Sequence, residues 1–459
     1  MLTYDLDKRG NKTMYEYLYE LIKEDIADGK LKADEKLPSK RGLSQHLQIS
    51  VKTVENAYEQ LLLEGYIRSE EKRGYYVNKI AVVTSGAPGY AAPVKRFQEE
   101  TYLADLTANN IRYDRFPFAT WAKVMRETLT DYNTSLLKTV PFNGVLQLRE
   151  AIADHLNRYR GMQVSADHII IGAGTEYLYN RLLQLLGPDV KFGVENPGYR
   201  KITKIYDENG VDWDYVNIDD KGMKVDELRM KDINVAHVSP EHHFPIGLVM
   251  PVARRQELLN WAAEEPGRYI IEDDFDCEFR MQGKPIPSIQ SRDRSHRVIY
   301  MNTFSKSLSS TIRISYMVLP IPLISTMNFY SCTVSGFEQY AMAAFIEKGY
   351  FERHIKRLVN DYRGRREKIC RMFRESRLNE ISTIYQDDAG THFLLHVKTS
   401  LSDVEIKWAV RQKGILINCL SEYCFADADK YHGILVIHYS DMDEATLKLV
   451  IAAFEEIFL

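Results

Sequence analysis

The stretch VIYMNTFSKSLSSTIR, residues 298–313, combines a β-branched and aromatic run with a loop of small hydroxyl residues around Lys306. A lysine just past a strand can form a Schiff base. Neighbouring hydroxyls such as that of Ser305, together with Arg313 seven residues further on, can bind a phosphate. Taken alone the pattern is weak, because most lysines are surface charges. Its interpretation therefore depends on other motifs of the chain.

A glycine-containing turn upstream fits the same kind of site. Residues 169–177, IIIGAGTEY, predict a strand that breaks at Gly174 and Thr175 before a helix. Backbone N–H groups at such a helix N-terminus receive a phosphate. An ordinary turn between a strand and a helix is the alternative for this motif taken by itself.

An acidic segment provides the third part of the pattern. Residues 269–276, YIIEDDFD, place Asp273 at the end of a buried strand. A carboxylate there can keep a pyridine nitrogen protonated, so that the ring acts as an electron sink. The competing interpretation is a divalent-metal site built from Glu272, Asp273, Asp274 and Asp276. Since no histidine or further ligand cluster accompanies them, we expect no metal.

Short β-branched runs alternate with stretches of helical period from Leu106 onward. This alternation predicts an α/β domain over residues 106–459, with a mainly parallel sheet and helices on both faces. The preceding residues 80–105 are rich in alanine, glycine and proline and predict a linker. The predicted strands lie at residues 168–171, 191–194, 234–238, 269–271, 298–301 and 314–319.

The composition fits a folded protein. Hydrophobic residues make up 45% and charged residues 27% of the 459, which excludes a disordered or fibrous chain. The net charge of −4 excludes a uniformly basic protein that coats nucleic acid, but not one with a local basic face. The five cysteines form no CxxC pair, so we expect neither a disulfide framework nor a zinc site. Because the sequence shows no apolar leader or membrane-spanning run, we expect a cytoplasmic protein.

Residues 1–79 alternate short amphipathic segments with turn signals. Thr13 and Glu16 form a capping box before a first helix. Two further helices, separated by a tight turn, are predicted within residues 40–65, and residues 66–77 predict a β-hairpin with a charged tip. These elements together make a helix-turn-helix followed by a wing.

The run LPSKRGLSQHLQISVKTVENAYEQLLLEGYI at 37–67, followed by RGYYV at 73–77, resembles the GntR-type winged helix in the order and spacing of every element. The resemblance implies operator DNA as a partner, with polar side chains in the major groove and basic ones on phosphates. The alternative is the solvated face of a small helical domain. Val51 departs from the family, which usually has arginine there, so the family's operator contacts cannot be copied. The expected DNA-binding residues are Lys40, Arg41, Ser50, Lys52, Thr53, Asn56, Arg73 and Gly74.

The order of motifs in the larger domain resembles that of fold type I aminotransferases. After the glycine turn come ENPGY at 195–199, HFPIG at 243–247, the acidic strand end, the lysine and the arginine. The segments 240–262, 271–280 and 302–313 are similar more narrowly to MocR-type regulators, in which a GntR-type winged helix is joined to an aminotransferase-like domain. The resemblance spans nearly the whole chain. It implies a fold type I, PLP-dependent transferase-like domain and a head-to-tail, domain-swapped homodimer.

The same resemblance implies pyridoxal 5′-phosphate as the cofactor. It makes Lys306 the Schiff-base lysine and pairs Asp273 with the pyridine nitrogen. It places Tyr199 beside the cofactor, although an aromatic residue there also fits plain core packing. Around the phosphate it places Arg313, Ser305, Gly174 and Thr175.

Three positions depart from the members that bind amino acids. Phe275, still beside the cofactor, stands where those members carry a tyrosine that donates to the cofactor's phenolic oxygen. Val436 is the position that we match to the arginine gripping a substrate α-carboxylate, and no arginine follows Arg411. Lys201 stands where members that respond to GABA have a second such arginine, and Arg200 is adjacent. Because a carboxylate left unpaired in a dry pocket is costly, an ordinary α-amino acid is a poor candidate ligand.

Three functions are compatible with the sequence. The first, which we favour, is a DNA-binding regulator that senses pyridoxal phosphate, or a small amine held at the Schiff base. The second is a working aminotransferase with an attached DNA-binding domain, and the third is a DNA-binding protein whose second domain is only a dimerisation scaffold. The complete winged helix argues against the pure enzyme, and the intact Lys306, Asp273 and Arg313 argue against the empty scaffold.

Overall fold

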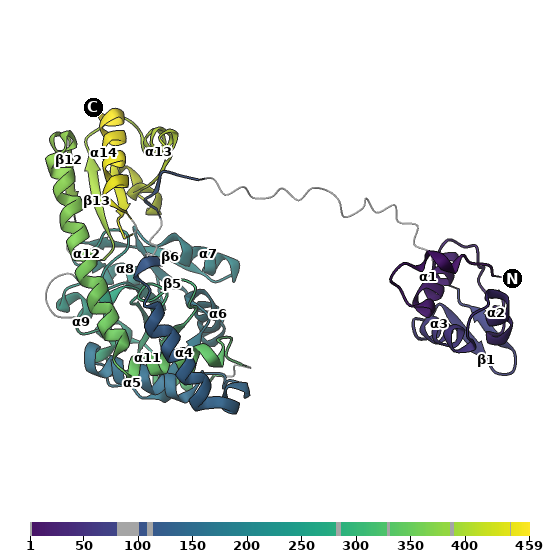
Figure 1. The fold of residues 1–459 in the computed structure, drawn as a ribbon. Coiled ribbons are helices and arrows are strands. Elements are labelled where there is room, and N and C mark those ends of the chain that lie inside the picture. Colours follow the sequence, from purple (N-terminus) through teal and green to yellow (C-terminus); the bar gives the residue numbers. More distant parts are fainter. Residues whose placement is uncertain are drawn as a thin grey trace. The chain divides into compact units, whose positions relative to one another are not determined.

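The chain forms two compact units, Met1–Glu99 and Glu100–Leu459 (Figure 1). The computed structural model describes residues 2–79, 101–107, 113–280, 286–327, 331–385, 390–440 and 442–459. Most of the linker expected at 80–105 lies outside the described residues. Its last two residues, however, form strand β3 (Ala104–Asp105), which pairs in parallel with β14 (Ile415–Leu416) of the larger unit.

The smaller unit is a three-helix domain with a hairpin, as the sequence predicts. The capping box of Thr13 and Glu16 is present at the start of the first helix. Apolar side chains of the first helix, such as Leu18 and Ile22, pack against those of the third, such as Tyr58 and Leu61. The elements are α1 (Met14–Ala27), α2 (Lys40–Leu47), α3 (Val51–Leu63), β1 (Ile67–Glu70) and β2 (Gly74–Val77), and the two strands pair antiparallel.

The larger unit is built on a sheet with the strand order β4-β11-β10-β9-β8-β5-β6-β7. Strands β4, β10, β9, β8, β5 and β6 run parallel, whereas β11 and β7 run antiparallel to their neighbours. The mainly parallel sheet expected from the sequence is therefore confirmed. The strands are β4 (Ile169–Gly172), β5 (Phe192–Asn196), β6 (Trp213–Asp219), β7 (Gly222–Met223), β8 (Val235–Val238), β9 (Tyr269–Asp273), β10 (Val298–Thr303) and β11 (Ser315–Val318).

Helices cover both faces of this sheet. In β4 the side chains of Ile169 and Ile171 join one core cluster and that of Ile170 joins another, because successive strand residues point to opposite faces. Helices α5 and α11 pack on the first cluster, and α6 and α7 on the second. The α-helices of this part of the larger unit are α4 (Phe118–Tyr132), α5 (Leu146–Arg160), α6 (Thr175–Leu186), α7 (Arg200–Glu208), α8 (Val225–Met230), α9 (Val252–Glu264), α10 (Ile321–Ile324) and α11 (Gly336–Glu347).

A smaller sheet with the order β12-β13-β16-β15 follows in the sequence. The long helix α12 (Tyr350–Glu375) runs from the helices beneath the large sheet to this second sheet (Figure 1). The remaining elements are β12 (Ser382–Tyr385), β13 (His392–Val397), α13 (Asp403–Gln412), β15 (Asn418–Cys419), β16 (Ile434–His438) and α14 (Glu444–Phe458).

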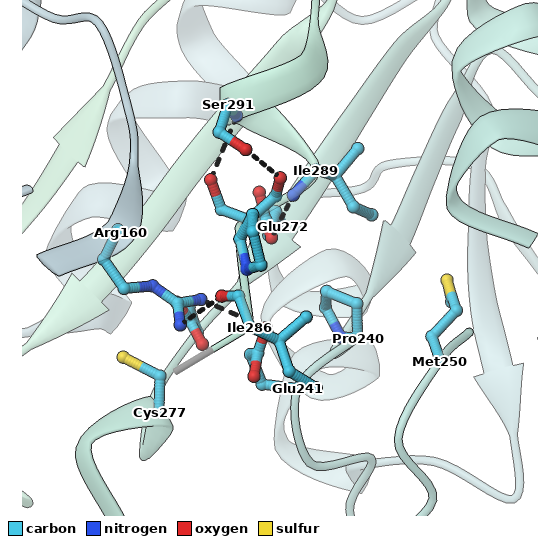
Figure 2. Close-up of polar contacts among 12 residues, drawn as sticks. Arg160, Pro240, Glu241, Met250, Glu272, Cys277, Ile286, Ile289 and Ser291 are labelled. Carbon is cyan, nitrogen blue, oxygen red and sulfur yellow. Dashed lines mark hydrogen bonds and ion pairs between the residues drawn. The ribbon is translucent and has the colours of Figure 1, made fainter. Parts of the chain in front are cut away.

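A buried ion pair connects helix α5 to the end of strand β9. The Arg160 guanidinium donates to Asp274 Oδ2 at 2.7 Å, and its Nη1 donates to the Ile286 carbonyl at 2.9 Å (Figure 2). Glu241 lies 3.3 Å from the same guanidinium, and the Tyr300 hydroxyl donates to Asp274 Oδ2 at 2.7 Å. The side chains of Arg160, Glu241, Asp274 and Tyr300 are all buried, so the network fixes the residue that follows β9.

We expect Arg160→Met to destabilise the larger unit by about 3–5 kcal/mol, because it leaves Asp274 buried without its cation. Arg158→Met is the matched control on the same helix. Arg158 forms an exposed pair with Asp154, so its loss should change the free energy of unfolding by less than about 1 kcal/mol. All four tryptophans belong to the larger unit, so tryptophan fluorescence in urea reports on that unit alone. Equal midpoints for the two variants would contradict the role of the pair.

Candidate functional site

A cavity of about 480 Å³ opens at the edge of the large sheet where the parallel strands end. The carboxyl ends of β4, β5, β8, β9 and β10 meet at this edge, and ligands of open α/β sheets bind there. The volume lies in the range of small-molecule sites. Asn418 and His438 of the small sheet, with Tyr423 of the short helix after β15, contribute a further wall.

The cavity brings together most of the side chains that the sequence singled out. Tyr199 lies at its rim with half of its surface exposed, packed edge-on against Phe244 and not in the core. Gly174 adjoins the cavity without lining it. The lining includes Thr175, Tyr199, Asp273, Phe275, Ser305, Lys306 and Arg313.

The carboxylates of the alternative metal site do not converge. Glu272 accepts hydrogen bonds from the backbone N–H groups of Ile289 and Gln290. Asp274 pairs with Arg160, as described above, and Asp276 Oδ2 lies 2.8 Å from His242 Nδ1. Within the described residues, no group of three or more histidine, cysteine or acidic side chains has the arrangement of a metal site.

A chain of hydrogen bonds orients Asp273. The Tyr179 hydroxyl donates to Asp273 Oδ2 at 2.9 Å and lies 3.0 Å from His237 Nε2. The Tyr206 hydroxyl lies 3.1 Å from His237 Nδ1. The Tyr179 hydroxyl donates its proton to Asp273, so its oxygen can only accept from His237. The ring proton of His237 is therefore assigned to Nε2, and Nδ1 accepts from the Tyr206 hydroxyl.

These hydrogen bonds leave the Oδ1 oxygen of Asp273 available for a ligand. Asp273 Oδ1 is buried and makes no hydrogen bond to any described residue. A buried carboxylate oxygen normally has a partner, and a pyridine N–H arriving in the cavity supplies one. The sequence analysis missed Tyr179 and His237. Tyr179 stands four residues after Thr175, so the helical period places it on the same face of α6.

The phosphate end of the cavity is formed by Arg313 and the N-terminus of α6. Gly174 has a φ of +93° and precedes Thr175, the first residue of that helix. A Cβ on Gly174 would lie 2.3 Å from Arg313 Nη2, so only glycine lets the guanidinium sit against the turn. A guanidinium beside free helix N–H groups is a suitable cradle for a phosphate. Ser305 Oγ donates to the Ile312 carbonyl at 3.5 Å and holds the loop between the lysine and the arginine.

Lys306 lies in the loop between β10 and β11. Burial lowers the pKa of its amine from the ordinary value, a nearby Asp276 partly opposes this, and Lys201 adds to it. A lowered pKa leaves more of the amine unprotonated, which is the form that reacts with an aldehyde. The buried orphan oxygen of Asp273, the phosphate cradle and this lysine together fit pyridoxal 5′-phosphate.

On β16 the residue that lines the cavity is His438. Val436, two residues earlier on the same face of the strand, is fully buried and packs with Leu394 and Leu420. Arg200 does not substitute for a carboxylate-binding arginine. Its guanidinium donates to the backbone carbonyls of Glu422 and Cys424 and lies over the Phe425 ring.

The predicted DNA-binding residues lie on α2, on α3 and at the hairpin tip of the smaller unit. Lys40 and Arg41 open α2, Lys52, Thr53 and Asn56 lie on α3, and Arg73 and Gly74 lie at the turn between β1 and β2. Ser50 caps α3, because its hydroxyl accepts from the Thr53 backbone N–H at 3.0 Å.

The sequence analysis missed Glu55, which lies between two of the predicted phosphate contacts. Lys40 Nζ donates to Glu55 Oε1 at 3.0 Å and Lys52 Nζ donates to Glu55 Oε2 at 2.9 Å. The two lysines, Lys52 first, hold the pKa of Glu55 below its usual range. Both cations therefore have an anionic partner within the domain itself.

Comparison with known proteins identifies both units. Residues 14–77 match the model for bacterial regulatory proteins of the gntR family, and residues 102–454 match aminotransferase class I and II. The crystal structure of a multiple substrate aminotransferase from Thermococcus profundus aligns with a TM-score of 0.69 at 23% identity, over 78% of this chain and 92% of that one. That likeness shows the fold. The chain is thus a winged-helix DNA-binding domain joined to a fold type I aminotransferase domain, whose cofactor is pyridoxal 5′-phosphate.

Relatives along almost the whole chain place it within a family. It is 36% identical to the uncharacterized HTH-type transcriptional regulator YdeL of Bacillus subtilis (strain 168), over 88% of each chain. It is 28% identical to the probable rhizopine catabolism regulatory protein MocR of Rhizobium meliloti, over 99% of this chain and 95% of that one. It is 29% identical to the pyridoxine biosynthesis regulator PdxR of Corynebacterium glutamicum, over 95% and 94%. The chain belongs to the MocR-type transcriptional regulators.

The cofactor, when bound, supplies an aldehyde and an electron-withdrawing ring. Lys306 would hold the aldehyde carbon, Asp273 the ring nitrogen, and Arg313 with the turn at Gly174 and Thr175 the phosphate. Phe275 lines the cavity but has no hydroxyl, so it cannot donate to the cofactor's phenolic oxygen.

None of the helices described is both long and apolar enough to cross a membrane.

Lys306→Ala should abolish the visible absorbance of a lysine-bound cofactor, because it removes the amine that forms the Schiff base. Lys201→Ala is the matched control, since Lys201 also lines the cavity but pairs with Glu176 at 2.9 Å. Spectra of both variants purified with pyridoxal phosphate provide the measurement. If the Lys306 variant keeps the wild-type spectrum, another amine anchors the cofactor.

Glu55→Gln should strengthen binding to duplex DNA of arbitrary sequence, because it frees Lys40 and Lys52 for phosphates. The plot of log affinity against log salt should steepen by up to about 2, one for each additional phosphate contact. Fluorescence anisotropy with the full-length protein measures both quantities. Glu59→Gln removes the same charge from the same helix and should have a smaller effect. Equal slopes for the two variants would show that Glu55 does not restrain the lysines.

Proposed function

We propose that this protein is a transcriptional regulator that binds operator DNA through its winged helix and senses pyridoxal phosphate, or a small amine held at Lys306, through its aminotransferase-like domain. In this proposal it acts in the cytoplasm, where operator DNA is found, and it does not turn over common amino acids. The proposal joins two features of the chain. One is the complete DNA-binding unit, and the other is a cavity with groups for the cofactor.

The observation that carries the proposal is the distribution of cations in the cavity. The cationic side chains that line it in the described residues are Lys201, Lys306 and Arg313. Lys306 and Arg313 have cofactor roles, and Lys201 pairs with Glu176. Apart from Arg313, no described residue that lines the cavity carries a guanidinium for an α-carboxylate. Loss of that contact weakens both binding and orientation of an amino acid, so turnover should suffer most.

Regulation requires that the cofactor bind one arrangement of the protein better than another. A head-to-tail, domain-swapped homodimer would present two winged helices to two half-sites, and the effective concentration of linked domains would raise affinity. Some apolar side chains of the larger unit are exposed in the single chain, and a partner subunit would cover such side chains. They include Phe118, Leu129, Leu137 and Leu146 of α4, α5 and the segment between them.

The relationship to aminotransferases supports the alternative function, an active aminotransferase with an attached DNA-binding domain. The fold is that of aminotransferases, and a lysine with a lowered pKa and an oriented Asp273 are also what an enzyme needs. The relatives named as regulators and the complete DNA-binding unit favour regulation. The name of the relative PdxR, which refers to pyridoxine biosynthesis, favours pyridoxal phosphate as the effector.

Two measurements on the cofactor-loaded full-length protein test this function. Glutamate, alanine, aspartate and 4-aminobutyrate should leave the cofactor spectrum unchanged over minutes, because the carboxylate has no cation. Removal of the cofactor should change the affinity for the promoter DNA next to the protein's own gene. Rapid conversion of the cofactor to its amine form by any of the four compounds would favour the enzyme. DNA affinity that is independent of the cofactor would exclude cofactor sensing.

A further inference from the structure

The part of the cavity lining formed by Phe244 and the small sheet with its neighbouring turn consists of histidine, aromatic and amide side chains. His438 of β16 pairs in register with His392 of β13, and their rings lie 5.2 Å apart. Phe244 stacks on His438 at 5.9 Å and contacts Tyr423 edge-on at 5.1 Å. Asn418 Nδ2 donates to the Tyr423 hydroxyl at 2.9 Å. The wall consisting of Phe244, Asn418, Tyr423 and His438 therefore carries polar groups but no permanent charge.

His438 is a polar residue of this wall with one buried nitrogen that has no hydrogen-bond partner among the described residues. It is only 5% exposed, yet it lines the cavity. Its Nδ1 is buried and makes no hydrogen bond to any described residue. An orphaned buried N–H is rarer than an orphaned acceptor, so the proton belongs on Nε2. His438 then offers one N–H donor to whatever enters the cavity.

The surroundings of His438 keep its ring neutral. Burial, followed by the charge of Lys306 and by His242, lowers the pKa of His438 to about 3, and Asp105 opposes this only weakly. The neighbouring His392, held by the Pro245 carbonyl at 2.8 Å, also has a pKa well below the ordinary value because of burial. His242 is engaged with Asp276.

A neutral hydrogen-bond donor binds a carboxylate less favourably than an uncharged carbonyl, because the two differ in their cost of desolvation. Both can accept its hydrogen bond, but the carboxylate loses its hydration without gaining a cation, which is costly in a buried site. An amide carbonyl or a hydroxyl gains the same hydrogen bond at a much smaller cost of desolvation. The wall thus selects by charge.

We propose that His438 determines the ligand specificity of this cavity, and that the ligand is a small primary amine whose neighbouring polar group is an uncharged acceptor, an amide or a hydroxyl. The inference rests on the proposed function, in which an amine is held at Lys306. It goes further by naming the chemical class of the amine and the residue that recognises it.

Alaninamide and alanine form the sharpest pair of probes, because they differ only in an amide against a carboxylate. Binding to the cofactor-loaded full-length protein is measured by titration calorimetry and by the change in the cofactor spectrum. The two are compared at equal free-base concentration, since their amines have different pKa values. We expect alaninamide to bind at least about tenfold more tightly than alanine. Ethylamine, which lacks both groups, gives the baseline for the amine alone.

Three variants assign the preference to His438. His438→Leu removes the donor and should bring alaninamide to within about threefold of ethylamine. His438→Asn keeps a neutral donor and should retain the preference for the amide. His438→Arg supplies the missing cation and should reverse the order of alaninamide and alanine. His396→Arg is the control: it adds the same charge on β13 but outside the cavity lining, and the wild-type order should persist.

The outcomes separate this inference from the proposed function. If the wild-type protein takes up no cofactor, the proposed function fails, and the specificity argument falls with it. If the cofactor binds but alanine binds as tightly as alaninamide, the inference alone is wrong. It is also wrong if His438→Leu and His438→Asn behave alike while both retain the cofactor spectrum of the wild type. Should His438→Arg fail to fold, these two neutral variants still decide.

Discussion

The buried pair of Arg160 and Asp274 is the constraint on which the geometry of the site depends. It joins the last residue of α5 to the residue after β9, and the Asp274 backbone N–H continues the ladder by donating to the Met301 carbonyl at 2.9 Å. Because consecutive residues of an extended chain point to opposite sides, fixing Asp274 on one side directs Asp273 to the other. The structural carboxylate and the ligand-binding carboxylate are thus neighbours with separate tasks.

The same network extends to the loop after β8. Glu241 lies beside Arg160 and accepts from Arg255 at 3.1 Å, and Arg255 also donates to the carbonyls of Met250, Pro240 and Pro287. This anchors the beginning of the HHFP segment, from which Phe244 reaches the cavity. A buried guanidinium with several carbonyl partners is a rigid support, because each of its three nitrogens donates to at least one acceptor. The segment that carries Phe244 is therefore held by the hydrogen bonds of Arg255, and the Phe244 ring by its contacts with Tyr423 and His438.

The cavity has one charged end and one neutral wall, and this division suits a sensor. In the proposed function, the charged end, with Arg313, Lys306 and Asp273, would hold the cofactor. The neutral wall, with His438 and Asn418, would offer a hydrogen bond but not the cation that anchors an amino acid. A protein that bound the cofactor without turning it over would keep its occupied state long enough for DNA binding to respond. In the smaller unit, Glu55 pairs with both Lys40 and Lys52, the two lysines predicted to contact DNA phosphates.

The sequence by itself determined the class of fold, and it predicted Lys306, Asp273 and Arg313, which the folded chain brings to one cavity. Hydrophobic periods and capping residues are local, so the winged helix and the strands around Lys306 and Asp273 could be predicted from short segments. The tertiary structure decided the neutral wall of the cavity. Val436 and His438 lie on the same face of β16, but only His438 lines the cavity, while Val436 packs against Leu394 and Leu420. This difference depends on segments distant in the sequence, so it leaves no local signal. The structure likewise supplied Tyr179 and His237 behind Asp273, and Glu55 between two lysines. Each of these depends on side chains that meet only after the chain has folded.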